Sequence, residues 1–205
     1  MQPHRFLNEE NILRSTPEVE YHPLRPFLPP DARVLFLGSF PPPCKRWCMD
    51  FFYPNWINDH WRIQGAVFFA DRDRFVDANR KTFLLDDIVE HCQSRGIAYF
   101  DTATAVRRLA ANASDKFLEV VEPTDIVALM QQLPRLRAIV CTGEKAATTL
   151  CERMNIPEVP KVNAAVPIPG TAIEFYRLPS SSRAYPLAFD KKVEAYRTMF
   201  EKYLG

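Results

Sequence analysis

Apolar residues follow two different spacings along the chain, and the two spacings alternate. Short continuous apolar runs predict buried strands, whereas apolar positions three to four residues apart predict helices with one inward face. We expect strands at 33–37, 97–100, 138–141 and 172–178, and helices at 56–68, 83–95, 126–133, 144–154 and 187–203. Strands that alternate with helices at this distance predict an α/β fold, with a parallel sheet between two layers of helices.

Capping residues mark several of these boundaries. Gly96 follows the helix at 83–95, where a residue in the left-handed conformation commonly ends a helix. Thr124 and Asp125 are expected to cap the next helix, which Pro134 stops. The prolines between 157 and 169 predict an irregular loop before the last strand.

The first thirty residues differ in composition from the rest of the chain. They are polar and rich in proline: Pro3, Pro17, Pro23, Pro26, Pro29 and Pro30. We expect an N-terminal arm at 1–30, packed on the surface, with a short helix near 9–13. The remaining residues, 31–205, are expected to form a single domain, because a chain of 205 residues with 47% hydrophobic content can build one sizeable core.

The charge is nearly balanced, with a formal net charge of +1. A polyanionic partner therefore has to be met by a local basic patch rather than by the field of the whole molecule. No apolar run reaches the roughly 20 residues of a membrane span, and the N-terminal segment lacks the apolar stretch of a signal peptide. We expect a cytoplasmic protein without a membrane partner, and a monomer.

The five cysteines form no Cys-x-x-Cys pair. Cys44 and Cys48 are four residues apart, but no second pair is placed to complete four metal ligands. Reduced thiols in a reducing compartment are the favoured interpretation. We therefore expect neither a metal nor a cofactor.

The segment after the first strand has an unusual composition. Gly38 and Ser39 end the strand, three prolines follow at 41–43, and the next residues are rich in aromatic side chains: Phe40, Trp47, Phe51, Phe52, Tyr53 and Trp56. Ligands of α/β proteins bind beyond the carboxyl ends of the strands. An aromatic surface with few carboxylates favours a flat, uncharged ring such as a nucleobase.

Several polar residues near these strand ends have both a functional and a structural interpretation. Asn58 could orient a water molecule through its amide, but Asn is also a favoured N-cap. Asp59 could activate water, although an early-helix Asp more often interacts with the helix dipole. His60 is expected on the surface or in packing. Thr142 and Gly143 could bind a phosphate or base oxygen at a helix N-terminus, or form a plain turn.

Three segments, in this order, resemble the uracil-DNA glycosylase superfamily. They are LGSFP at 37–41, YPNWINDHW at 53–61 and LPSSS at 178–182. The nearest branch is the hypoxanthine-DNA glycosylase family, whose first motif reads G-S-x-P and runs into a P-x-N-x-x-W segment. The resemblance covers residues 33–203. It implies a three-layer α/β/α sandwich with a short, mainly parallel central sheet.

The resemblance also implies an activity, which is hydrolysis of the N-glycosidic bond of a deaminated base, hypoxanthine or uracil, at the start of base excision repair. The partner would be DNA with the damaged base flipped out, since the bond cannot be reached inside the stack. No lysine is placed as a Schiff-base nucleophile, so a monofunctional glycosylase is expected.

The motifs assign roles to individual residues. Asn58 aligns with the Asn of the P-x-N-x-x-W segment and would be catalytic, although two extra residues could shift the alignment to Asn55. The base-binding residues would be Gly38, Ser39, Phe40, Phe52 and Tyr53, with backbone amides near Ser39 and stacking on Phe52 or Tyr53. The DNA-binding residues would be Ser180, Ser181, Ser182, Arg183 and Tyr185, of which Tyr185 could enter the gap left by the base. Arg107, Arg108 and Lys116 could extend this basic surface, but a solvated face is favoured.

Some positions depart from the superfamily pattern. Phe40 stands where many members carry an Asp or Asn that positions the attacking water. No histidine follows Leu178, and Arg183-Ala184-Tyr185 replaces the expected P-A-N. Two other functions therefore stay open, which are a non-catalytic relative that binds damaged DNA and an enzyme of the same fold that processes nucleosides.

Overall fold

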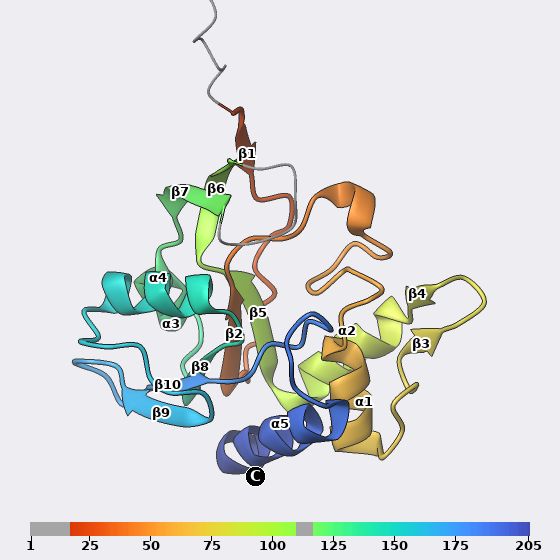
Figure 1. Cartoon of the computed structure of the whole chain (residues 1–205). Coiled ribbons are helices and arrows are strands. Elements are labelled where there is room, and N and C mark those ends of the chain that lie inside the picture. The colour runs from red at the N-terminus through yellow and green to blue at the C-terminus, as the bar shows by residue number, and fades with distance from the viewer. Residues whose placement is uncertain (1–16, 110–116) are drawn as a thin grey trace, which may run out of the picture.

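The structure is a computed structural model that describes residues 17–109 and 117–205 (Figure 1). Its centre is a five-stranded sheet with the strand order β5-β2-β8-β10-β9. The strands are β2 (Val34–Gly38), β5 (Ile97–Asp101), β8 (Ala138–Cys141), β9 (Ala164–Pro167) and β10 (Glu174–Arg177). Neighbours pair in parallel from β5 to β10, and β9 alone pairs antiparallel. The predicted α/β fold with a mainly parallel sheet is confirmed.

Helices cover both faces of this sheet. They are α1 (His60–Phe69), α2 (Leu85–Arg95), α3 (Ile126–Gln131), α4 (Glu144–Met154) and α5 (Phe189–Leu204). The first two and α5 lie on one face, and α3 and α4 on the other (Figure 1). This division follows from right-handed crossovers. The chain moves from β2 to β5 in one direction along the sheet and then from β5 through β8 to β10 in the other.

Burial on both faces explains why the strands have continuous apolar sequences. All residues of β5 and β8 are buried, and so are the first four of β2. The largest fully buried side chains include Trp61 on α1, Tyr99 on β5 and Tyr196 on α5. Their packing fixes α1 and α5 against the sheet, close to the ends of the central strands.

Two small antiparallel sheets were not predicted. One contains β1 (Val19–Tyr21), β6 (Ala103–Arg108) and β7 (Leu118–Pro123), and the other pairs β3 (Val76–Asp77) with β4 (Thr82–Phe83). A further correction concerns 157–169, where an irregular loop was expected and β9 is found. Pro167 ends this strand, and an edge strand tolerates proline because one of its sides forms no ladder.

Several element boundaries differ from the predictions by a few residues. The helix expected from 56 begins at His60, and the helix expected from 83 begins at Leu85. The predicted caps are confirmed. Gly96 ends α2 in the left-handed conformation at φ 71°, and Asp125 caps α3 by accepting a hydrogen bond from the Ala128 amide at 2.9 Å.

The described part of the N-terminal segment contacts the small sheet of β6 and β7 and also the central five-stranded sheet. Strand β1 pairs with β6, and further along Phe27 exchanges two backbone hydrogen bonds, of 3.0 and 2.9 Å, with Tyr99 at the edge strand β5. The short helix expected near 9–13 lies outside the described residues. In the described ranges, no helix combines the length and the apolar character required to cross a bilayer.

Candidate functional site

A cavity of about 930 Å³ opens at the carboxyl ends of the central strands. Gly38 ends β2, Asp101 ends β5, and Thr142 follows β8, and all three line the cavity. The connection that leaves β2 runs through α1 and α2 to β5, and the connection that leaves β8 runs through α4 to β10 in the opposite direction along the sheet. The cavity therefore lies at the topological switch point between β2 and β8, where α/β proteins bind ligands.

Most of the residues predicted from the sequence meet at this cavity. The lining includes Gly38, Ser39, Phe40, Phe52, Tyr53, Asn58, Ser180, Ser181, Ser182 and Arg183. Asn55, the alternative to Asn58, lines it as well, and so do Thr142 and Gly143. Tyr185 is half-buried beside this group and is not a lining residue.

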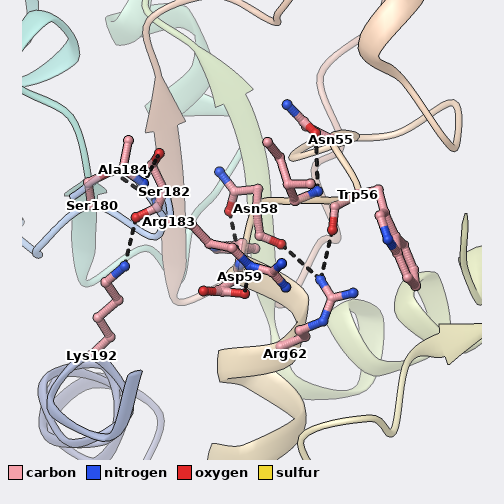
Figure 2. Close-up of polar contacts among 12 residues, drawn as sticks. Asn55, Trp56, Asn58, Asp59, Arg62, Ser180, Ser182, Arg183, Ala184 and Lys192 are labelled. Atoms are coloured by element: carbon pink, nitrogen blue, oxygen red, sulfur yellow. Dashed lines mark hydrogen bonds and ion pairs between the residues drawn. The ribbon is translucent and has the colours of Figure 1, made fainter. Parts of the chain in front are cut away.

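Two segments far apart in the sequence are joined at the rim of the cavity (Figure 2). Asn58 forms a β-bridge with Ser182, and the Asp59 amide donates to the Ser181 carbonyl at 3.1 Å. Arg183 Nε donates to Asp59 Oδ1 at 2.8 Å. Because Asp59 is 5% exposed, this ion pair is shielded on one side and ties the loop after β10 to the start of α1.

A buried lysine on α5 also binds the loop that follows β10. Lys192 on α5 is 2% exposed, and its ammonium donates to the Ser182 carbonyl at 2.7 Å (Figure 2). Burial lowers the pKa of Lys192, while the nearby Asp59 opposes that shift. The loop 180–184 is therefore fixed through the Arg183 side chain and through the backbone carbonyls of Ser181 and Ser182.

Asn58 contacts the start of α1 and also lines the cavity. Its Oδ1 accepts a hydrogen bond from the His60 amide at 2.9 Å, so it satisfies a free N–H at the start of α1. The other half of the amide, Nδ2, has no partner among the residues that the structure describes. Asn58 is partly exposed and lines the cavity, so a ligand or water can still reach it.

Arg62 fixes the turn that presents Asn58. Its guanidinium donates to the carbonyls of Trp56 at 2.9 Å and Asn58 at 3.2 Å (Figure 2). It also lies 4.5 Å from the centroid of the Trp56 ring and 5.1 Å from that of Phe83. Arg62 is 5% exposed, and this burial, together with the charge of Arg183, lowers its pKa.

Tyr53 forms part of the cavity wall in an uncommon backbone conformation. Its φ is 51°, and its hydroxyl lies 3.2 Å from Thr142 Oγ1. The ring stacks on His60, with centroids 3.7 Å apart and planes 6° apart. His60 is fully buried, and burial lowers its pKa well below the ordinary value, so its imidazole is neutral.

The other two aromatic residues predicted to bind a base are directed mainly into the protein. Phe52 is 5% exposed and stacks on Tyr99 at 5.7 Å between centroids. Phe40 is 7% exposed and meets the edge of the His22 ring at 5.3 Å. Arg108 lies over Phe40 and donates to the Pro41 carbonyl, so this arginine supports the proline loop.

Several groups of the cavity were given no role in the predictions from the sequence. Asp101 is 7% exposed, and its Oδ2 lies 2.9 Å from His22 Nε2. The sequence feature that indicates Asp101 is its position directly after the apolar run of β5. Ile57 is 54% exposed at the rim. The cations Arg46 and Lys145 also line the cavity with Arg183, and nothing in their sequence context marked them.

The donor set gives no support for a metal. Across residues 17–109 and 117–205, no three His, Cys, Asp or Glu side chains gather as metal ligands. The cavity therefore offers aromatic faces, hydroxyl and amide groups, one buried carboxylate and a cationic rim.

Fold and cavity together define a three-layer α/β protein with a cavity at the switch point of its sheet. Neither a family model nor a curated protein matches the sequence. Among solved structures, a similar chain is the solution structure of a Methanosarcina acetivorans protein named "putative Uracil DNA glycosylase". The two chains share 21% identity with a TM-score of 0.59, over 90% of this chain and 99% of the other. This likeness establishes a common fold.

Proposed function

We propose that this protein belongs to the uracil-DNA glycosylase superfamily and is a monofunctional DNA glycosylase. Its substrate would be a deaminated base, hypoxanthine or uracil, flipped out of DNA at the start of base excision repair. The observation that carries the proposal is the convergence of three sequence motifs, distant along the chain, on one cavity at the switch point of the sheet. The fold shared with the archaeal protein supports the same conclusion.

The wall of the cavity suits a flipped base. Tyr53 presents an aromatic ring that is supported from behind by His60, and stacking on such a ring accepts any base. Gly38 and Ser39 line the cavity at the end of β2, and in this proposal backbone N–H groups of this turn contact the carbonyl oxygens of the base. Charge on the departing base would be stabilised by these N–H groups.

Asn58 would orient the attacking water. Its Oδ1 already accepts from the His60 amide, and a carbonyl oxygen has a second lone pair. Together with Nδ2, this leaves one acceptor and two donor positions toward the cavity. Because the same bond fixes the side chain, the amide is pre-oriented, and positioning of this kind accelerates a reaction whose leaving group is already good.

The rim would contact the DNA backbone and the gap left by the base. Arg46, Lys145 and Arg183 supply cations around the cavity, and the partly exposed Ser180 and Ser182 supply hydroxyl groups for phosphate oxygens. Ser181, predicted to bind DNA, is 1% exposed, and its carbonyl accepts from the Asp59 amide. Ile57 is an exposed apolar side chain at the same rim, and enzymes that unstack DNA insert side chains of this kind.

Base release from defined duplexes tests the proposal. Duplexes with one uracil, hypoxanthine, xanthine or mismatched thymine are incubated with the protein, and abasic sites are then cleaved with alkali. We expect release of at least one deaminated base, and a loss of about 10²-fold or more in Asn58→Ala with DNA binding retained. Full activity in Asn58→Ala combined with loss in Asn55→Ala would transfer the role to Asn55.

A second candidate is a non-catalytic protein that binds damaged DNA. Two observations favour it, which are Phe40 in place of a polar residue and the use of Asn58 Oδ1 by the backbone of α1. This candidate predicts tight binding to abasic or damaged duplexes without release of any base. Binding and release measured on the same duplexes separate the two functions.

A further inference from the structure

We propose that the Asp101 carboxylate accepts the proton of the attacking water, and that His22 from the N-terminal segment positions this carboxylate. The inference rests on the proposed glycosylase function. It assigns the proton acceptor of the reaction to the end of β5, because the first motif supplies Phe40 where a polar residue would be needed.

Asp101 is the buried carboxylate of the cavity. In the described ranges, the only other carboxylate that lines the cavity is Glu144, and Glu144 is exposed and pairs with Arg177. Asp59 is close in sequence to Asn58 but is occupied by Arg183 and is not a lining residue. Asp101 is therefore the carboxylate of the cavity wall that we assign as the proton acceptor.

The position of Asp101 depends on the glycine at the end of the neighbouring strand. Gly38 pairs with Asp101 across β2 and β5, and a Cβ atom at Gly38 would collide with Asp101 Oδ1. The absent side chain leaves the space in which Oδ1 lies beside the wall of the cavity. One carboxylate oxygen is thus directed toward Gly38, and the other, Oδ2, faces His22.

His22 is buried and held on both sides of its ring. Its side chain is 3% exposed, its Nε2 lies 2.9 Å from Asp101 Oδ2, and its Nδ1 lies 3.1 Å from the Leu24 amide nitrogen. Nδ1 also lies 2.9 Å from the Leu24 carbonyl oxygen. Because an ionised carboxylate only accepts hydrogen bonds, the Nε2 atom that faces Asp101 carries a proton. The Nε2–H then donates to Asp101, which keeps the carboxylate in one orientation.

Aromatic packing excludes other positions for the imidazole. The ring of His22 lies 4.7 Å from that of Phe100 and 5.3 Å from that of Phe40, between centroids. Phe40 therefore has a structural use at the place where a water-positioning residue was expected. It supports His22, and His22 supports the carboxylate.

The proposed step is a balanced hydrolysis. The bond between C1′ of the sugar and the base nitrogen breaks, and its electron pair leaves with the base. A water oxygen forms the new bond to C1′, and one proton of this water passes to Asp101. The departing base takes up a proton, and Asp101 returns its own to solvent, so the products are the free base and a sugar hydroxyl.

Single-turnover release from the same duplexes tests the inference, together with DNA binding and thermal unfolding of each variant. Asp101→Asn keeps the shape and removes the proton acceptor, and we expect release of every base to slow by about 10²-fold or more while binding changes less than about threefold. His22→Leu should slow release as well. His22→Gln retains an N–H that can reach Asp101 and should restore most of the rate.

Several outcomes would overturn this assignment. Unchanged release in Asp101→Asn would exclude Asp101 as the acceptor, and altered preference among bases at an unchanged rate would make it a base-reading residue. Equal losses in His22→Gln and His22→Leu would reduce His22 to packing. Glu90→Gln, on the exposed side of α2, is the matched control. If the wild type releases no base, the glycosylase proposal itself fails, whereas activity in both the wild type and Asp101→Asn contradicts this inference alone.

Discussion

The ring of Tyr53 lies parallel to the buried imidazole of His60, with 3.7 Å between the centroids and 6° between the planes. Tyr53 adopts this position at a φ of 51°, a conformation that costs about 1–3 kcal/mol in a non-glycine residue. The surrounding structure therefore has to hold the ring in place. His60 below it and Thr142 at its hydroxyl provide two of these contacts.

Replacement of Tyr53 tests the stacking role. Tyr53→Ala removes the ring, and we expect about 10- to 100-fold weaker binding of a flipped base, since stacking on an aromatic side chain contributes about 1–3 kcal/mol per base. Tyr53→Phe keeps the ring and removes the hydroxyl that contacts Thr142. It should retain activity within a few-fold. Equal activity in Tyr53→Ala and the wild type would show that the base does not depend on stacking on Tyr53.

Arg62 should contribute to stability through the turn that presents Asn58. Arg62→Lys cannot reproduce the two hydrogen bonds to carbonyls and the packing between Trp56 and Phe83. We expect a loss of about 1–3 kcal/mol in the free energy of unfolding, measured with urea. Arg80→Lys, at a largely exposed position, is the control and should remain within about 0.5 kcal/mol.

Ile57 should act on duplex DNA and have little effect on folding. It is 54% exposed, so Ile57→Ala is expected to unfold like the wild type. If the side chain fills the gap left by a flipped base, release from duplexes should slow by about tenfold, and release from single strands should not. Val127→Ala, at a similarly exposed position on α3, should affect neither. Equal slowing on both substrates would exclude insertion.

His91 should make the folded state sensitive to acid. Its Nε2 contacts Gln64 Oε1 at 3.0 Å, and burial lowers its pKa from 6.5 to about 4. Since the unfolded chain binds the proton first, stability is complete above pH 6.5 and falls as the pH decreases toward 4, by up to about 3 kcal/mol.

Urea unfolding across this pH range checks the prediction. His91→Gln has no titratable group at this position and should show a smaller loss between pH 6.5 and 4 than the wild type does. A part of the loss will persist, because burial also lowers the pKa of His60. Parallel curves for His91→Gln and the wild type would show that His91 does not cause the acid sensitivity.

The sequence by itself determined the layered fold and the edge where the cavity lies. Apolar runs at β2, β5 and β8 could be recognised because burial on both faces requires continuous hydrophobic residues. Parallel strands then bring their carboxyl ends to one side, which placed Gly38, Asn58 and the loop after β10 near one another. The caps at Gly96 and Asp125 followed from local backbone chemistry.

Tertiary structure alone decided the partners of these residues. The ion pair of Arg183 with Asp59 and the contact of His22 with Asp101 join positions 124 and 79 residues apart, and no local pattern encodes such a distance. The small sheet of β1, β6 and β7 was missed for the same reason, because short edge strands are stabilised by cross-strand neighbours more than by their own sequence. Local propensity thus fixes elements and caps, whereas the chemistry of this cavity depends on which distant side chains packing brings together.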